Sequence, residues 1–234
     1  MQKLILPLDN AQITAGYKSR TYKNKYGFNH YGMDLIDKYG NRKITSLGSG
    51  TVVACGMDGR NPKEKLGNAV VIVYKAVALS RDEKITDLAC RMYHLDSISV
   101  KVGQKLRVGD EIGYYGNTGV YTSGAHLHIE FDSDVNYPQY AYGIGRNGLV
   151  IKKGTVDSTI SPSEVMWKGD NQKFFYNERD VRDGWIDRSE TEYKKVEDRE
   201  TVADILKDVK NEISILEKTN KAYFERIINK LNKI

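Results

Sequence analysis

The segment 121–131, which reads YTSGAHLHIEF, constrains the fold of this chain more than any other stretch. Its apolar residues Leu127, Ile129 and Phe131 alternate with polar ones, the pattern of a strand with one face on a core. Residues two apart in a strand point the same way, so His126 and His128 would project from the other face about 7 Å apart along the chain. The segment therefore predicts a strand that packs on one side and presents a metal site on the other.

Strand patterns and glycines continue through the neighbouring sequence. Apolar, β-branched runs occur at 44–55, 68–74 and 88–94, and residues 100–119 carry a glycine every few positions. Helices do not tolerate so much glycine, so we expect an all-β domain. The charged residues 75–87 are expected to form an extended hairpin tip or a loop.

The first thirty residues are polar and rich in Tyr, Lys and Asn, with turn positions at Gly16 and Gly27. We expect them to form a surface approach to the first motif.

All four histidines of the chain lie at expected strands or strand edges. His30 and Asp34 are four residues apart and share a face if this segment is extended. Zinc accepts an imidazole and a carboxylate together, and three ligands with one open position make a catalytic site with a bound water of pKa near 7. Two further histidines would then be free for acid–base work. The spacing does not decide whether His126 or His128 binds the metal, and a lone histidine such as His94 is more often a structural residue than a ligand.

Six segments in collinear order, within about residues 16–131, carry a resemblance to a known family. They are His30-x-x-x-Asp34, Gly48-x-Gly50, Tyr93-His94-Leu95, VGQKLRVGDEIG at 102–113, GNTG at 116–119 and GAHLHIEF at 124–131. Together they resemble the M23 metallopeptidases, the lysostaphin/LytM group of peptidoglycan endopeptidases. The resemblance implies a compact antiparallel β-fold with a groove for an extended peptide.

Carried over residue by residue, the resemblance implies that His30, Asp34 and His128 hold a Zn²⁺ ion. His126 and His94 would flank the bound water, as the general base and as a stabiliser of the tetrahedral intermediate. A tyrosine often helps to hold the oxyanion in such enzymes, and Tyr22 and Tyr26 lie upstream of His30, with Tyr26 the candidate for substrate binding.

The implied function is a zinc-dependent endopeptidase that cuts peptide bonds in the stems or cross-bridges of bacterial peptidoglycan. Two alternatives remain: a catalytically silent cell-wall binder, and a structural component of a phage tail or virion. The candidate metal ligands are all retained, which favours the enzyme.

Beyond the catalytic strand the pattern becomes less regular. Ser161 and Pro162 predict the start of a short helix, because Pro is favoured at the first helical position. We place a peptidase domain at residues 1–169, a charged linker at 170–200 and a heptad helix at 201–234.

The last 34 residues contain no Gly or Pro and carry an apolar seven-residue repeat, typical of a long helix or coiled coil. One register comprises Leu206, Ile213, Asn220, Ile227 and Ile234; the other comprises Val202, Val209, Leu216, Tyr223 and Lys230. Such a helix would form a homo-oligomer, bind a virion partner, or pack on its own domain.

Composition excludes several other classes. Cys55 and Cys90 have no metal-binding or framework spacing and are expected to be buried thiols. The formal net charge of +5 is small and no nucleic-acid recognition element is present. No apolar run approaches the roughly 20 residues of a membrane span, and the amino terminus lacks a signal-peptide core. An enzyme that acts on the cell wall outside the cytoplasm would then be virion-associated or released by phage lysis.

Overall fold

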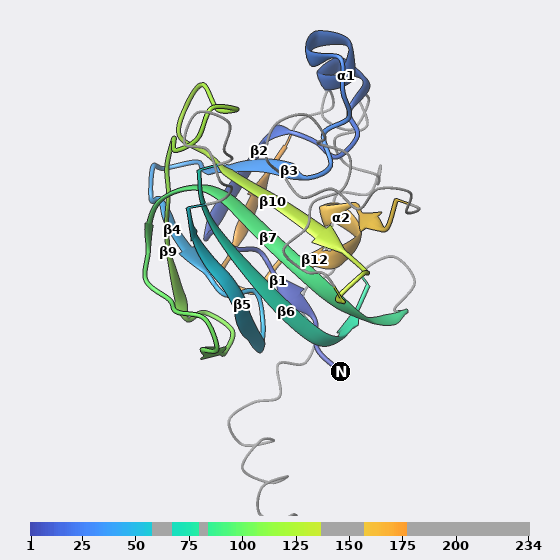
Figure 1. Ribbon diagram of the computed structural model, residues 1–234, viewed down its shortest axis with the longest axis vertical. Helices are drawn as coiled ribbons and strands as arrows, with labels where there is room; N and C mark the ends of the chain where they lie inside the picture. The colour runs from blue at the N-terminus through green and yellow to red at the C-terminus, as the bar shows by residue number, and fades with distance from the viewer. Residues whose placement is uncertain (58–66, 80–83, 137–156, 177–234) are drawn as a thin grey trace, which may run out of the picture. The chain divides into compact units, whose positions relative to one another are not determined.

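The computed structural model describes residues 1–57, 67–79, 84–136 and 157–176. In this described part, eleven strands form one largely antiparallel sheet, in the order β13-β2-β3-β10-β7-β6-β5-β8 (Figure 1). Strand β11 pairs with β10, and β9 pairs with both β4 and β7. The elements are β1 (Leu4–Ile5), β2 (Asn10–Ala15), α1 (Arg20–Tyr26), β3 (Met33–Asp37), β4 (Lys43–Thr45), β5 (Gly50–Met57), β6 (Asn68–Ala78), β7 (Ile85–Ile98), β8 (Lys105–Leu106), β9 (Glu111–Tyr115), β10 (Leu127–Asp132), β11 (Thr159–Ile160), α2 (Pro162–Val165), β12 (Met166–Trp167) and β13 (Lys173–Phe175). The mainly β prediction is confirmed.

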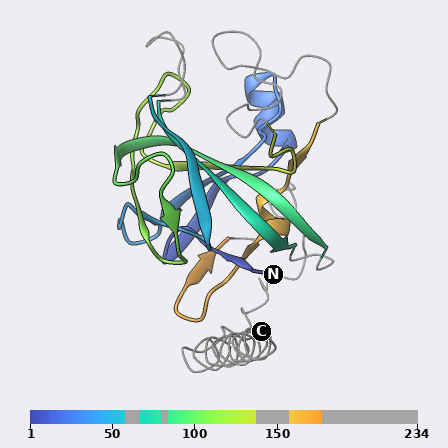
Figure 2. The same cartoon turned by 60° about the horizontal axis from the view of Figure 1, so that its bottom comes forward.

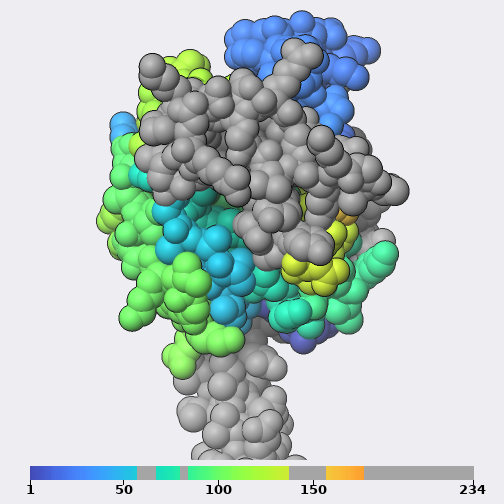
Figure 3. Space-filling model, viewed as in Figure 1, coloured from blue at the N-terminus to red at the C-terminus, as the bar shows by residue number. Residues whose placement is uncertain are grey.

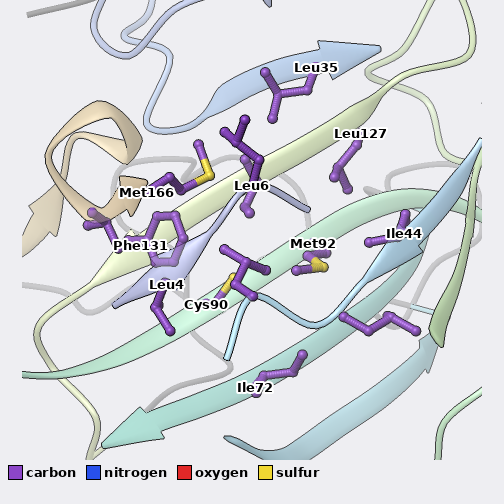
Figure 4. Close-up of a cluster of buried hydrophobic side chains, with 14 of the residues drawn as sticks. Leu4, Leu6, Leu35, Ile44, Ile72, Cys90, Met92, Leu127, Phe131 and Met166 are labelled. Atoms are coloured by element: carbon purple, nitrogen blue, oxygen red, sulfur yellow. The ribbon is translucent and has the colours of Figure 1, made fainter. Parts of the chain in front are cut away.

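Strand β10 lies between β3 and β7 and packs its apolar face on the core. Leu127, Ile129 and Phe131 have no exposed surface, so the predicted alternation is confirmed. Figure 4 shows Leu127 and Phe131 among the core side chains, together with Leu35 of β3 and Met92 of β7. Burying such side chains contributes roughly 1.5–3 kcal/mol each relative to exposure. This packing directs the opposite face of β10 toward the candidate site.

The expectation that the first thirty residues only approach the site over the surface is wrong. They contain β1, β2 and α1, and Leu4, Leu6 and Leu8 are almost fully buried in the core. Leu4 and Leu6 lie beside the side chains of β10 and β7 in Figure 4. The physical reason is that residues 4–8, LILPL, form a short apolar run, which the average polarity of the first thirty residues hides.

The hairpin of β6 and β7 extends into the charged segment 75–87. Val77 pairs with Thr86 and Ala78 with Ile85, while residues 80–83 lie outside the described part. The extended-hairpin form of that prediction is therefore confirmed, with most of the segment in the two strands.

The segment 157–176 returns to the N-terminal strands (Figure 2). Strand β12 pairs with β1, and β13 joins the sheet beside β2, so ordered structure continues past the predicted boundary at Gly169. The buried amide of Gln172 accepts from the backbone N–H of Leu6 and donates to the carbonyl oxygens of Leu6 and Leu8. Helix α2 begins at Pro162 as predicted.

Cys90 is buried, Cys55 is partly buried, and both are free thiols. None of the helices in the described residues is long and apolar enough to cross a membrane. The remaining predicted linker residues 177–200 and the heptad helix at 201–234 lie outside the described residues.

Candidate metal centre

The register of β3 against β10 brings two predicted ligands together. Asp34 pairs directly with His128, and His30 precedes β3 at the end of the connection from α1. The Oδ1 atom of Asp34 lies 2.8 Å from Nδ1 of His128 and 3.1 Å from Nε2 of His30. The two imidazole nitrogens are 3.0 Å apart. Three ligand atoms from three places in the sequence therefore meet at one point.

This arrangement fits a zinc ion. A tetrahedral ion with bonds of about 2.0–2.1 Å has ligand atoms roughly 3.3 Å apart, close to the three separations found here. Two imidazoles and one carboxylate are zinc ligands, and three protein ligands leave a fourth position open. His30, Asp34 and His128 are the group of His, Cys, Asp or Glu residues in the described part that has this geometry.

Hydrogen bonds to the second ring nitrogens aim both imidazoles at this point. Nδ1 of His30 donates to the carbonyl oxygen of Gly16 at 2.8 Å, which leaves its Nε2 lone pair facing Asp34. Nε2 of His128 lies 3.1 Å from Oε1 of Glu130, and its Nδ1 faces Asp34. Metal-binding histidines commonly have such a carbonyl or carboxylate partner.

The same geometry makes the centre favour positive charge. Burial alone would raise the pKa of Asp34, but its two histidine neighbours hold that pKa well below the ordinary value. Burial lowers the pKa of His128, and hydrogen bonds to Asp34 and Glu130 outweigh burial and raise it to about 10. A proton or a metal ion at this point is therefore stabilised by the surrounding carboxylates.

His94 and His126 lie beside these three residues. Their rings are 4.8 Å apart between centroids, and the His94 ring is 6.0 Å from that of His128. Nε2 of His126 lies 3.6 Å from Oδ1 of Asp34. The structure thus gathers all four histidines and Asp34 at one site, while the division into ligands and catalytic residues stays a prediction.

Backbone carbonyls orient these two rings as well. Nδ1 of His94 donates to the carbonyl oxygen of Thr118 at 3.0 Å, and Nδ1 of His126 donates to that of Gly124 at 2.7 Å. In the neutral form of each ring, Nε2 is then the nitrogen that can accept a proton. Burial, followed by the charges of His128 and His126, lowers the pKa of His94 to about 4, so this ring is neutral near pH 7.

His94 has a left-handed backbone, with φ of 68°, inside strand β7. The pairing of β7 with β6 shifts register between Met92 and Leu95, around this residue, and its pairing with β9 shifts between Leu95 and Ser97. A left-handed conformation costs a non-glycine residue about 1–2 kcal/mol. Strained backbone of this kind is concentrated at functional sites, where it aims a side chain.

Aromatic side chains form the wall of a pocket that His30, His94 and His128 also line. The aromatic lining residues are Tyr22, Phe28, Tyr31 and Tyr121. Tyr22 projects from α1, which stands out from the surface in Figure 3, and stacks on His30 with 4.4 Å between ring centroids. Burial, then the negative charge of Asp34, raises the pKa of Tyr22.

Of the two tyrosines proposed from the sequence, the pocket contains Tyr22 and not Tyr26. Tyr26 is 48% exposed and contacts two lining residues of the pocket, Tyr22 and Phe28, with ring centroids 4.5 and 6.4 Å away. Tyr26 lies one helical turn after Tyr22 and packs behind these two rings, outside the pocket lining.

The sequence analysis missed Arg91 and Glu130, which are fully buried behind His128. Glu130 was detectable, because it has the same strand phase as His126 and His128. Arg91 carried no such signal, since its contact with Glu130 depends on the pairing of β7 with β10.

Comparisons with known proteins find similarity to a family of peptidases. Residues 28–138 match the sequence profile of peptidase family M23. An uncharacterized metalloprotease of Buchnera aphidicola subsp. Baizongia pistaciae is 32% identical over 103 residues, which make up 43% of this chain and 22% of that protein. The chain therefore spans about a fifth of the length of this curated relative.

Two solved structures are also similar. A zinc containing peptidase from Vibrio cholerae has 28% identity and a TM-score of 0.40, covering 55% of this chain and 35% of that one. The catalytic domain of lysostaphin from Staphylococcus simulans has 25% identity and a TM-score of 0.34, covering 44% and 67% respectively. On the profile match, which includes His30, Asp34, His94, His126 and His128, residues 28–138 form a domain of peptidase family M23.

Proposed function

We propose that this protein is a zinc-dependent endopeptidase that hydrolyses peptide bonds in the stems or cross-bridges of bacterial peptidoglycan, outside the cytoplasm. The observation that carries the proposal is the convergence of His30, Asp34 and His128 within hydrogen-bonding distance, beside two oriented histidines. A zinc ion held there would lower the pKa of a coordinated water to near 7 and polarise the scissile carbonyl.

The chain's own residues supply the remaining chemistry. His126 and His94 carry Nδ1 protons held by backbone carbonyls, so each offers an Nε2 lone pair to the site. One ring takes a proton from the attacking water and later returns it to the leaving amine. The other ring, when it has taken up a proton from solvent at Nε2, stabilises negative charge on the carbonyl oxygen and keeps that proton throughout. Proton transfer of this kind contributes typically 10²–10⁴-fold to rate.

The pocket wall supports an extended peptide as substrate. Tyr22, Phe28 and Tyr121 provide apolar ring surface next to the candidate ligands. Among the residues that the structure describes, no acidic side chain lines this pocket. Aromatic walls with a few fixed polar groups are typical of sites that bind and orient small ligands.

The test is mass spectrometry of soluble fragments released by the zinc-loaded protein from purified peptidoglycans with different cross-bridges. Fragments with new peptide termini are expected, and their masses identify the bond. A protein that binds zinc stoichiometrically and releases nothing from any wall would contradict the proposal and favour the silent binder.

We further propose that residues 201–234 form a heptad helix that joins copies of the chain or attaches it to a larger assembly such as a virion. The support is the seven-residue apolar repeat, with Asn220 at a core position that can fix register. Deleting residues 201–234 should leave cleavage of soluble peptides intact and reduce the oligomer mass in sedimentation. A full chain that sediments as a monomer would refute self-association, and a virion fraction without the protein would refute attachment.

A further inference from the structure

One of the four histidines is held differently from the others. His30, His94 and His126 each donate from Nδ1 to a backbone carbonyl oxygen, at 2.8, 3.0 and 2.7 Å. His128 alone presents Nδ1 to the ligand cluster and holds its Nε2 proton against a carboxylate, that of Glu130. A carbonyl is fixed by the backbone, whereas a carboxylate at the end of a side chain must itself be fixed.

Arg91 fixes that carboxylate. The two oxygens of Glu130 have separate partners: Oε1 faces His128 at 3.1 Å, and Oε2 accepts from Nε of Arg91 at 3.0 Å. The Nη2 group of Arg91 donates to Oδ2 of Asp132 at 3.0 Å. The other oxygen of Asp132 accepts from Ser158 and from the backbone N–H of Asp134, at 2.7 and 2.8 Å.

Strand register explains how these groups meet. Glu130 is paired directly with Arg91 across β10 and β7, and Asp132 follows two residues later on the same face of β10. His128, Glu130 and Asp132 therefore form one row, with the Arg91 guanidinium bridging its last two members.

Burying these charged side chains carries a desolvation cost in the free energy of folding. The side chains of Arg91 and Glu130 are 0% exposed and that of Asp132 is 2% exposed. A buried ion pair is often no more stabilising than well-packed apolar residues of similar volume. With Asp34 included, the buried cluster contains three carboxylates and one guanidinium, so its formal charge is −2 while the imidazoles are neutral. That charge matches a divalent cation at the converging ligand atoms.

We propose that Arg91, Glu130 and Asp132 are positioning residues that keep the proton of His128 on Nε2 and aim its Nδ1 at the metal. The inference rests on the proposed function, because the metal is the zinc ion of that function. It predicts that zinc affinity depends on groups that never touch the ion, as is found where a carboxylate supports a metal-binding histidine.

Glu130→Gln is the sharpest variant because it keeps the shape and removes one acceptor. Both Nε of Arg91 and Nε2 of His128 donate to Glu130, one to each oxygen, whereas an amide has a single oxygen. If the amide NH₂ turns toward His128, the ring must carry its proton on Nδ1, the ligand atom. We expect zinc affinity to fall about 10–100-fold. Asp132→Asn, one step further away, should cause a smaller loss, about threefold to tenfold.

Glu111→Gln is the matched control. Glu111 pairs with Lys43 on the surface, 3.5 Å away and 38% exposed, and has no contact with the histidines. Zinc affinity is measured by competition with a chromogenic chelator, after circular dichroism has established that each metal-free variant is folded. Nitrogen-15 NMR of the histidine rings in the zinc-loaded protein reports directly which nitrogen of His128 carries the proton.

The outcomes are separable. Weakened zinc binding in Glu130→Gln and Asp132→Asn, with Glu111→Gln at the wild-type level, supports the positioning role. Wild-type zinc affinity in both site variants, whatever happens to their unfolding temperature, would mean that the row is only structural and would overturn this inference alone. A wild-type protein that binds no zinc would overturn the proposed function together with it.

Discussion

Gly32 lies against the imidazole ring of His128. A β-carbon at Gly32 would be 2.6 Å from Nε2 of His128 and 2.5 Å from the backbone oxygen of Ile129, distances that real β-carbons do not reach. The close approach of β3 to β10 at the candidate centre therefore requires a residue without a side chain at this position.

Gly32→Ala should displace the His128 ring and weaken zinc binding by about tenfold or more, with an overpacking cost of roughly 1–3 kcal/mol in the free energy of unfolding. The measurements are chelator competition and chemical denaturation. Gly124→Ala is the matched control, since a β-carbon there would have no neighbour within 4 Å. Equal zinc affinity in the two variants would show that the ring tolerates the displacement.

Substitution should distinguish the role of His128, in β10, from that of His126, which directly precedes β10. His128→Ala is expected to lose both zinc and activity, because Nδ1 of His128 is one of the three converging atoms. His126→Ala is expected to keep zinc and to lose about 10²–10⁴-fold in turnover, the contribution of a general acid or base. Metal content by mass spectrometry and peptide turnover distinguish them, and a metal-free His126→Ala protein would reverse the assignment.

The left-handed backbone of His94 predicts an unusual rank of stabilities. His94→Gly should be more stable than His94→Ala by about 1 kcal/mol, because glycine adopts positive φ without a steric cost. Both variants should lose most turnover. Ala89 is the control, because it is buried in β7 and does not have a positive φ. Ala89→Gly should instead destabilise the protein by about 0.5–1 kcal/mol. Denaturant unfolding measures all three, and an alanine variant at 94 as stable as the glycine variant would argue against backbone strain.

The pKa of His94 predicts how the stability of the metal-free protein depends on pH. That pKa is about 4 in the folded protein and 6.5 for an unperturbed ring. Between these values only the unfolded chain takes up the proton. The free energy of unfolding therefore decreases as pH falls from about 6.5 to 4. The loss amounts to about 3 kcal/mol, at about 1.4 kcal/mol for each pKa unit. Denaturant titrations across this range should show a flatter profile for His94→Gln, and identical slopes would assign the effect to another group.

Much of the site was accessible to local sequence reasoning. The alternation of Leu127, Ile129 and Phe131 predicted both the strand and its buried face, and the two-residue spacing of His126 and His128 placed both at one site. These inferences succeed because they depend only on the geometry of a single strand. The misplaced first thirty residues show the limit, since Leu4 and Leu6 are buried by partners that lie far away in the sequence.

The amino-acid sequence alone predicts a glycine-rich, mainly β chain with four histidines and one aspartate in positions that suit zinc, and it carries a resemblance to a peptidase family. Which atoms meet at the site depends on how the strands pair. The pairing of Asp34 with His128, and of Arg91 with Glu130, depends on the register between β10 and its two neighbours. Register is set by how many side chains pack at once across a sheet, and a shift of one residue turns every side chain to the other face. This register, rather than any local pattern, places His128 and not His126 opposite Asp34.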